Sequence, residues 1–204
     1  MIAIIHYGSG NIQAIGNIYH RLNVPFVIAA RPEDLEKATK IILPGVGAFD
    51  QAIRELEKSG LREALNKHVL HNKKPLLGIC VGMQLLANSS EEGVLKGLGW
   101  IDGSVRRFDH ARFIQATHLP HMGWNDVEPG KDNPLFNDVG SGARYYFLHS
   151  YYFSCCRRED ILATTDYGGT FASAVNSENI YGVQFHPEKS HQAGIQLLKK
   201  FSNL

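Results

Sequence analysis

The sequence predicts an α/β protein with a mostly parallel open sheet, helices on both faces, and antiparallel strands that extend the sheet in the C-terminal half. Strand-like apolar runs alternate with amphipathic helical patterns up to about residue 95, which is typical of right-handed βαβ units. Short β-rich segments follow, separated by proline-containing loops, and these predict antiparallel hairpins. The length of 204 residues, with no evident linker or internal repeat, predicts a single domain over 1–204.

The elements of the first half follow from its alternating pattern. Short apolar runs predict strands at 2–5, 26–29 and 40–43 and a further strand that ends at Cys80. Helical spacing of apolar residues predicts helices at 11–22, 32–38, 49–58 and 61–72. Polar and functional side chains should gather at the carboxyl ends of the parallel strands, because open sheets of this kind place their sites there.

The second half predicts β structure and one final helix. Strands are expected at 105–108, 145–153, 171–175 and 180–185. The last segment, 191–201, predicts a helix because Ala193, Leu197 and Phe201 recur at every fourth position.

Cys80 stands where a buried strand should turn sharply into a helix. It follows the apolar run 75–79, and good helix formers resume at 83–87. Near a helix N-terminus, unpaired N–H groups favour a thiolate over a thiol. Gly78 and Gly82 flank the cysteine and let neighbouring backbones approach closely. The pattern predicts a nucleophile elbow with sulfur in place of serine oxygen, and the alternative is an ordinary buried cysteine.

A second motif, near the C-terminus, supplies a base and an orienting group. A strand-like run leads into His186, Pro187 and Glu188. Because proline is unfavourable inside a helix, we place His186 and Glu188 on extended backbone, where residues two apart project to the same side. Glu188 would then fix the tautomer of His186 so that its other nitrogen faces a thiol. Alone, His186 is better interpreted as structural, but together with Cys80 it predicts a thiol-nucleophile site.

Acyl transfer to sulfur also needs N–H donors that stabilise an oxyanion. The N–H of Val81, directly after the nucleophile, is one candidate. We predict the second at Val46, because Gly45 and Gly47 on either side allow its peptide plane to approach closely or to reorient. An ordinary glycine turn is the alternative interpretation of this loop.

Composition limits the possible partners and the compartment. Lys and Arg total 21 against 20 Asp and Glu, so the net charge of +1 indicates neither a nucleic acid nor a membrane surface as partner. Three cysteines cannot all pair, and Cys155 and Cys156 are adjacent, so we expect a reducing cytoplasm. We expect no targeting leader or membrane span. The histidines lack the accompanying ligands of a metal site, so neither a metal nor a cofactor is predicted.

Two tracts, GICVGMQLL at 78–86 and GVQFHPEKS at 182–190, resemble the class I glutamine amidotransferases, which have a Cys, His and Glu triad and a flavodoxin-like fold. Three further stretches narrow the resemblance: PGVGAF at 44–49, PHMGWN at 120–125 and YYFLHSYY at 145–152. With these, the whole chain is similar to the glutaminase subunits of imidazole glycerol phosphate synthase, of the HisH type. His6 and Val81 depart from that pattern, which more often has an acidic residue and a leucine there.

The resemblance implies a reaction, a partner and further site residues. Cys80 would attack the side-chain amide of L-glutamine, His186 would transfer protons and Glu188 would orient His186. The ammonia would pass through a channel to a β/α-barrel cyclase, forming a heterodimer that makes imidazole glycerol phosphate and AICAR in histidine biosynthesis. The residues carried over are Gly47, Gln84, Tyr146, Ser150 and Tyr151 as glutamine contacts, and Asn11, Met122, Trp124 and Lys189 at the partner interface.

Three alternatives stay open on the sequence alone. The same glutaminase chemistry could feed another acceptor, such as a sugar amidotransferase of a surface-polysaccharide pathway. A cysteine peptidase on a similar α/β scaffold also uses an elbow thiol, but it would cleave peptides and ignore free glutamine. A non-enzymatic regulatory module would keep its role after Cys80→Ala.

Overall fold

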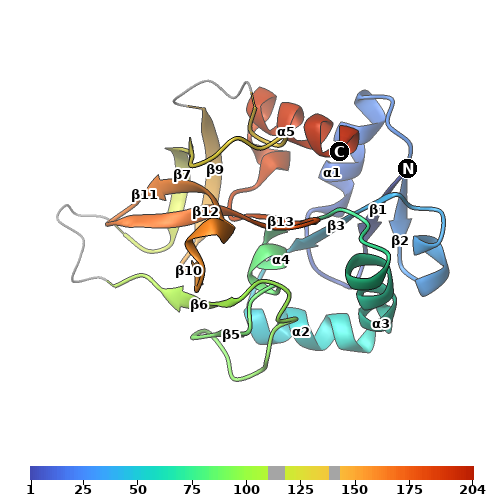
Figure 1. Ribbon diagram of the computed structural model, residues 1–204, viewed down its shortest axis with the longest axis horizontal. Coiled ribbons are helices and arrows are strands. Elements are labelled where there is room, and N and C mark those ends of the chain that lie inside the picture. The colour runs from blue at the N-terminus through green and yellow to red at the C-terminus, as the bar shows by residue number, and fades with distance from the viewer. Residues whose placement is uncertain (110–117, 138–142) are drawn as a thin grey trace.

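The computed structural model describes residues 1–109, 118–137 and 143–204. Its central feature is an eleven-stranded sheet within these residues (Figure 1). One half of the sheet is parallel and runs in the order β2-β1-β3-β4-β13. Its strands are β1 (Ile2–Ile5), β2 (Phe26–Ala29), β3 (Lys40–Gly45), β4 (Leu76–Cys80) and β13 (Ile180–Val183). The last parallel strand is thus contributed by the far end of the chain.

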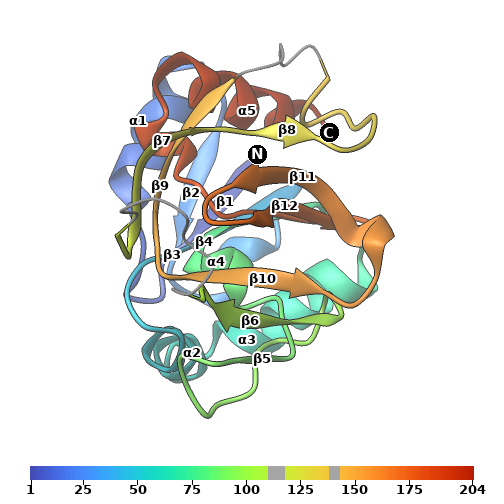
Figure 2. The ribbon, with the colours of Figure 1, turned by 90° about the vertical axis from the view of Figure 1, so that its left-hand side faces the viewer.

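The other half of the sheet is largely antiparallel. β13 pairs with β12 (Thr170–Ser177), which pairs with β10 (Tyr151–Cys155) and β11 (Ile161–Asp166). Beyond β10 lie β6 (Gly103–Arg107) and β5 (Ser89–Ser90), and beyond β11 lies β8 (Glu128–Pro129), as Figure 2 shows. A separate two-stranded sheet joins β7 (His121–Asp126) to β9 (Arg144–His149).

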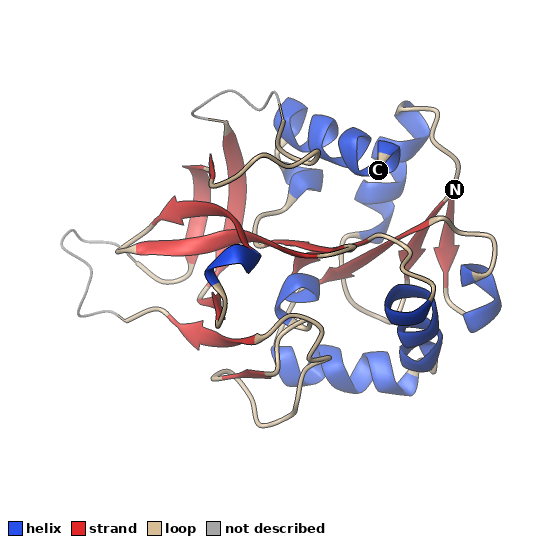
Figure 3. Ribbon diagram, in the orientation of Figure 1, coloured by secondary structure: helices blue, strands red, loops and turns tan. Residues whose placement is uncertain are grey.

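Helices cover both faces of the sheet (Figure 3). α1 (Ile12–Arg21) and α5 (His191–Asn203) pack together on one face. α2 (Phe49–Lys58), α3 (Leu61–Leu65), a π-helical turn (Asn66–His71) and α4 (Val81–Gln84) lie on the other. The strands between them are buried on both sides, as in β1 and β4, where every residue is buried. This is the arrangement that a near-continuous apolar strand requires.

Most of the predicted elements are confirmed, and three of those away from Cys80 differ for identifiable reasons. The helix predicted at 32–38 is one 3₁₀ turn (Pro32–Leu35), closed by Asp34, which accepts the backbone N–H groups of Ala30 and Arg31. The helix predicted over 61–72 divides into α3 and the π-helical turn. The strand predicted at 145–153 breaks at Ser150, because β9 pairs with β7 whereas β10 joins the main sheet.

Other strands were not predicted at all. β7 was not predicted because its pattern is inverted, with apolar Met122 and Trp124 exposed and polar His121 buried. β11 was not predicted because its apolar run is short and polar residues follow it. No helix of the described residues has the length and apolar character needed to cross a membrane.

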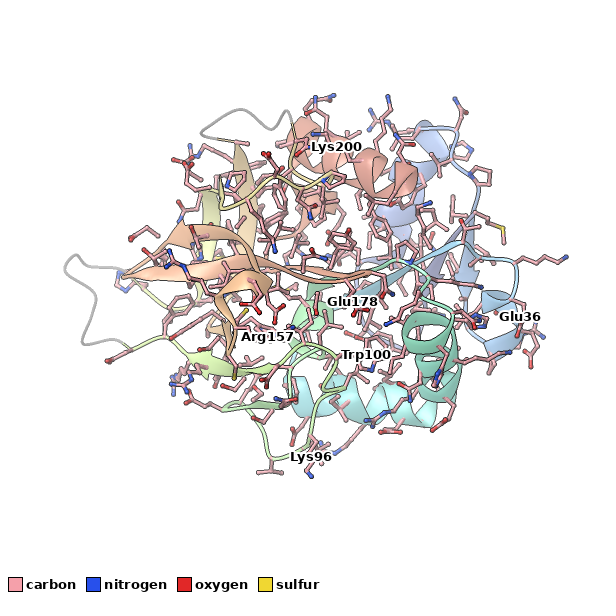
Figure 4. The ribbon with its side chains drawn as sticks, in the orientation of Figure 1. Glu36, Lys96, Trp100, Arg157, Glu178 and Lys200 are labelled. Atoms are coloured by element: carbon pink, nitrogen blue, oxygen red, sulfur yellow. The ribbon has the colours of Figure 1, made fainter. Side chains whose placement is uncertain are left out.

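Surface ion pairs occur at both ends of the molecule: Arg144 and Asp126 pair across β9 and β7, and another pair lies at the end remote from these strands. Glu36 lies there (Figure 4) and pairs with Lys67. Such exposed pairs contribute little to stability, typically about 0–1 kcal/mol. The buried sheet, and not these surface pairs, therefore positions the site.

Candidate active site

A cavity of about 250 Å³ opens beside the carboxyl ends of β3 and β4. Cys80, at the end of β4, and His186, which follows β13, both line it, so the fold brings together the two motifs that the sequence separates. The other lining residues are Val46, Gly47, Val81, Gln84, Glu92, Pro120, Leu148, His149, Ser150 and Tyr151.

Cys80 sits on a strained turn of the predicted elbow type. Its φ of 54° and ψ of −113° are unusual for a residue with a side chain. Close backbone packing holds the turn, since a Cβ on Gly78 would lie 2.7 Å from the Gly82 carbonyl oxygen. A Cβ on Gly82 would likewise collide with the Leu43 carbonyl oxygen. The prediction that these glycines permit close backbone approach is confirmed.

The helix after Cys80 is shorter than predicted. α4 ends at Gln84 after a single turn, and Leu86 and Ala87 already make tighter bonds to the carbonyls three residues back. The N–H of Asn88 then bonds to the Gly103 carbonyl at the start of β6. The chain leaves the helix because the sheet provides its next hydrogen-bond acceptor.

His186 and Glu188 are joined by a hydrogen bond of 2.8 Å between Nδ1 and Oε1, and both side chains are buried. The predicted extended backbone is wrong for Glu188, which lies in a 3₁₀ turn over Pro187–Lys189. Proline is well tolerated at the first position of such a turn, where its missing N–H is not needed. The turn brings the carboxylate back to the imidazole as effectively as an extended chain would. His186 is held further by its own backbone N–H, which donates to the Tyr146 carbonyl at 2.8 Å.

The surroundings of His186 favour its protonated form, an imidazolium between Cys80 and Glu188. Burial opposes protonation of His186, but hydrogen bonds to Cys80 and Glu188 outweigh it and raise the pKa of His186 to about 10. Burial also opposes the charge of Glu188, but hydrogen bonds from His186 and Asn11 keep the pKa of this carboxyl below its usual value. With Nδ1 donating to Glu188, the Nε2 of His186 is left to exchange a proton with sulfur.

Asn11, predicted at a partner interface, contacts the carboxylate of Glu188. Its Nδ2 donates to Glu188 Oε1 at 2.7 Å, so this oxygen accepts from both Asn11 and His186. Asn11 occupies the N-cap position of α1 but makes no side-chain capping bond there. Its side chain is therefore committed to Glu188 rather than to its own helix.

The two predicted oxyanion donors differ in availability. Val81 is the first residue of α4, where an N–H has no acceptor within the helix. The N–H of Val46 instead donates to the Ser9 hydroxyl oxygen at 2.8 Å, and that hydroxyl donates to the Val46 carbonyl at 2.7 Å. In this structure the Val46 N–H is thus engaged by Ser9. Sequence reasoning missed Ser9 because it lies in another loop.

Four of the five predicted glutamine contacts, Gly47, Gln84, Ser150 and Tyr151, line the cavity. Tyr146 is not among the lining residues; its ring lies 5.7 Å from the Nζ of Lys189 and makes an edge contact with Trp124. Sequence reasoning missed Glu92, Pro120, Leu148 and His149. No local sequence pattern marks Glu92 as a site residue. A contact with a distant segment holds it at the cavity, because its carboxylate accepts the N–H of Phe49, at the start of α2, at 2.8 Å.

A buried chain of hydrogen bonds connects β7 to the cavity. The carbonyl of Tyr151 can only accept, so the Nδ1 of His149, 2.7 Å away, must carry the proton. His149 Nε2 then accepts from His121 Nδ1 at 3.0 Å, and His121 Nε2 accepts from Asn125 at 3.2 Å. Burial lowers the pKa of His121 to about 4 and that of His149 to about 3, so both are neutral.

Exposed apolar side chains lie in the cavity wall and on the neighbouring face of β7 and β9. Met122 pairs with Leu148 across β7 and β9, and Trp124 lies two residues along β7 on the same side. Leu148 and Val46 line the cavity itself. We call Val46, Met122, Trp124 and Leu148 the mouth patch; all four are exposed, Met122 to 64%. Lys189 is joined to this region through its contact with Tyr146.

The arrangement suits nucleophilic chemistry on a small amide or ester. It provides a thiol, an imidazole fixed by a carboxylate, and a cavity beside them that is lined by both polar and apolar side chains. Within the described residues no three His, Cys, Asp or Glu side chains gather into a group that could hold a metal ion.

Comparisons with known proteins agree on one family. The model of the family "Glutamine amidotransferase class-I" matches residues 4–203. The chain is 54% identical to the HisH subunit of imidazole glycerol phosphate synthase from Bdellovibrio bacteriovorus, and 47% identical to that of Leptospira borgpetersenii, over the full length of each pair. It is also 49% identical to HisH 2 of Methanococcus maripaludis, over 98% of both chains.

Solved structures show the same fold at lower identity. A glutamine amidotransferase superposes with a TM-score of 0.74 at 18% identity, over all of both chains. A putative GMP synthase protein from Thermoplasma acidophilum superposes with a TM-score of 0.73 at 20% identity, covering 99% of this chain and 92% of that one.

Proposed function

Because this chain belongs to the class I glutamine amidotransferases and, within them, to the HisH subunits of imidazole glycerol phosphate synthase, we propose that Cys80, His186 and Glu188 are its catalytic triad. The chain is a glutaminase that releases ammonia from L-glutamine for histidine biosynthesis. The observation that carries the triad is the strained Cys80 elbow in one cavity with a His186 already oriented by Glu188.

The steps follow from these groups. Cys80 Sγ adds to the side-chain amide carbon of glutamine while its proton resides on His186. The carbon–nitrogen bond breaks, and His186 protonates the departing nitrogen to give ammonia. Water, deprotonated by His186, then hydrolyses the thioester to glutamate and restores the thiol. Glu188 stabilises the imidazolium throughout.

The cavity offers matching groups for the rest of the substrate. The carboxylate of Glu92 suits the α-ammonium group of glutamine, and the side-chain oxygen of Gln84 can accept a hydrogen bond from it. Ser150 and Tyr151 supply further polar contacts along the same wall, beside Gly47. A carboxylate in so small a cavity, close to Cys80, supports a free amino acid with its own α-ammonium group as the substrate.

We assign the oxyanion hole to Val46 and Val81, with Val46 held in an inactive state here. Removing one oxyanion donor typically costs about 2.7–4 kcal/mol, or a factor of roughly 10² to 10³ in turnover. Engagement of Val46 by Ser9 therefore supports a chain that is slow alone. Control of this kind keeps glutamine from being wasted when no acceptor is present, and it couples two sites.

The partner is a β/α-barrel cyclase, which joins this chain in a heterodimer. We assign its docking to the mouth patch together with Asn11 and Lys189. Exposed apolar side chains with an aromatic anchor are typical of such interfaces. Their position around the cavity lets ammonia pass to the partner without meeting bulk water, in which it would become ammonium.

We further propose that residues 1–204 act as one domain and that the protein works in the cytoplasm. One sheet includes strands from residues 2 to 183, which supports the first point. All three cysteines are free, which supports the second.

A glutaminase assay tests the function directly. Glutamate formation is measured for the chain alone, with the purified cyclase, and with the cyclase and its ribonucleotide substrate. We expect the last mixture to be fastest, and Cys80→Ala to be inactive in all three. Equal rates in the three mixtures would contradict the coupling, and activity of Cys80→Ala would contradict the triad.

A further inference from the structure

Gln184 has a buried side-chain amide whose orientation is fixed from outside the catalytic triad. The backbone carbonyl of Tyr151 can only accept hydrogen bonds. Gln84 therefore presents its Nε2 to that carbonyl, at 3.2 Å, and the same Nε2 donates to Gln184 Oε1 at 3.1 Å. The amide of Gln184 is thus held with its oxygen toward Gln84.

The nitrogen of this amide faces the nucleophile. Gln184 Nε2 lies 3.8 Å from Cys80 Sγ, within hydrogen-bond range for sulfur. The sheet explains this proximity. Val183 pairs with Ile79 in the parallel ladder of β13 and β4, and Gln184 and Cys80 are the residues that follow them. Gln184 is fully buried, so its amide has no water to turn toward.

The other group near the sulfur is a carbonyl. Cys80 Sγ lies 4.0 Å from the Leu148 oxygen, to which a thiol can donate. Once the thiol loses its proton, the sulfur can no longer donate a hydrogen bond to the Leu148 carbonyl. The partial negative charge of that oxygen then disfavours the thiolate. The N–H of Gln184 is the group placed to compensate, since hydrogen bonds to charged acceptors are the stronger ones.

From this geometry we propose that Gln184 is a further catalytic residue, whose amide donates to the Cys80 sulfur and stabilises the thiolate. The proposal rests on the proposed function in taking Cys80 as the nucleophile. When sulfur gives its proton to His186, the Gln184 N–H stays on nitrogen and only its hydrogen bond strengthens. Gln84 is the positioning residue that prevents the Gln184 amide from turning over.

Alkylation of Cys80 by iodoacetamide tests the proposal without glutamine. The rate is measured between pH 5 and 10 on the full chain, and mass spectrometry of the Cys80 peptide separates it from Cys155 and Cys156. The variants are Gln184→Glu, which keeps an oxygen for Gln84 but turns a second one toward sulfur, and Gln184→Met, which removes both polar atoms without adding charge. The matched control is Asn133→Asp, an amide-to-acid change at another buried position.

We expect both Gln184 variants to lower the alkylation rate at pH 7 by about tenfold, the effect of losing one hydrogen bond to a charged group. The pH midpoint of alkylation should rise in both, more in Gln184→Glu because of its charge, and stay unchanged in Asn133→Asp. Unchanged profiles in both variants would overturn the proposal. A change in Gln184→Glu alone would overturn it too, because it would show repulsion and not a lost donor.

The test separates this proposal from the proposed function. If Gln184→Glu fails to fold by circular dichroism, the uncharged Gln184→Met decides the outcome. If the alkylation profiles shift as expected but Cys80→Ala still hydrolyses glutamine, the triad assignment fails and the role of Gln184 toward sulfur stands. If hydrolysis depends on Cys80 but the profiles do not shift, only the role of Gln184 fails.

Discussion

The hydroxyl of Ser9 binds both backbone polar groups of Val46, accepting from its N–H at 2.8 Å and donating to its carbonyl at 2.7 Å. One side chain thus holds the two peptide planes on either side of Val46. Gly45 and Gly47 would let these planes turn, so the Ser9 hydroxyl is the group that selects one orientation.

Ser9→Ala should therefore raise the glutaminase rate of the isolated chain. Losing hydrogen bonds worth about 1 kcal/mol would shift the population of the free Val46 N–H by roughly fivefold. Ser9→Thr keeps the hydroxyl and serves as the control. Glutamate release without the partner is the measurement, and a rate equal to or below that of the parent would contradict this role.

Cys80→Ala should abolish hydrolysis while glutamine still binds, because the cavity walls remain in place. Glu188→Ala should impair turnover less severely, since it removes the orienting group and leaves nucleophile and base. Steady-state kinetics together with calorimetric titration of glutamine provide the measurement. Retained turnover in Cys80→Ala would rule out a thioester.

Asn11→Ala should lower kcat by about tenfold, because the buried Glu188 carboxylate loses one of the two donors to Oε1. The other oxygen, Oε2, is buried with no hydrogen-bond partner in the described part of the chain, so it offers no compensation. Asn17→Ala, an exposed change on the same helix, is the control. The partner-free rate should be measured, since a loss seen only with the cyclase present would indicate an interface role instead.

The buried histidines make the fold sensitive to acid. His121 and His149 stay neutral in the folded state, whereas the unfolded chain takes up protons on them below about pH 6.5. The stability that they contribute is therefore present above pH 6.5 and is lost as the pH falls toward 4, by about 1.4 kcal/mol per pH unit for each histidine. His186 has a raised pKa, so its contribution is lost only as the pH rises from 6.5 toward 10.

Urea unfolding at pH 7 and pH 5 measures this effect. His149→Gln should show a smaller loss of unfolding free energy between the two pH values than the parent chain. An identical loss in both proteins would mean that other groups cause the acid sensitivity.

Met122→Ser and Trp124→Ala should weaken binding of the cyclase, by about 1 to 3 kcal/mol for the tryptophan, without changing alkylation of Cys80. Val94→Ser, at an exposed apolar residue outside the mouth patch, is the control. Analytical ultracentrifugation of the mixture measures the association. Unchanged affinity in both patch variants would place the interface elsewhere.

The parallel half of the fold and the residues that we propose as the triad could be predicted from the sequence because they stand at local signals. Apolar runs mark β1 and β4, and Cys80 and His186 stand at or just beyond the ends of such runs. The rest depends on contacts between distant segments. Asn11 reaches Glu188, and Ser9 reaches Val46, only because separate loops meet at the same sheet edge. The division of 145–153 between two sheets likewise has no local cause.

The position of β13 also affects how the sheet assembles during folding. This strand fills the centre of the sheet between β4 and β12, yet it lies far from β4 along the chain. Until it inserts, two sheet edges stay unpaired, and long-range pairing of this kind is slow to form. Until β13 is inserted, Cys80 at the end of β4 therefore has no His186 beside it, so the two groups meet only when the sheet is complete.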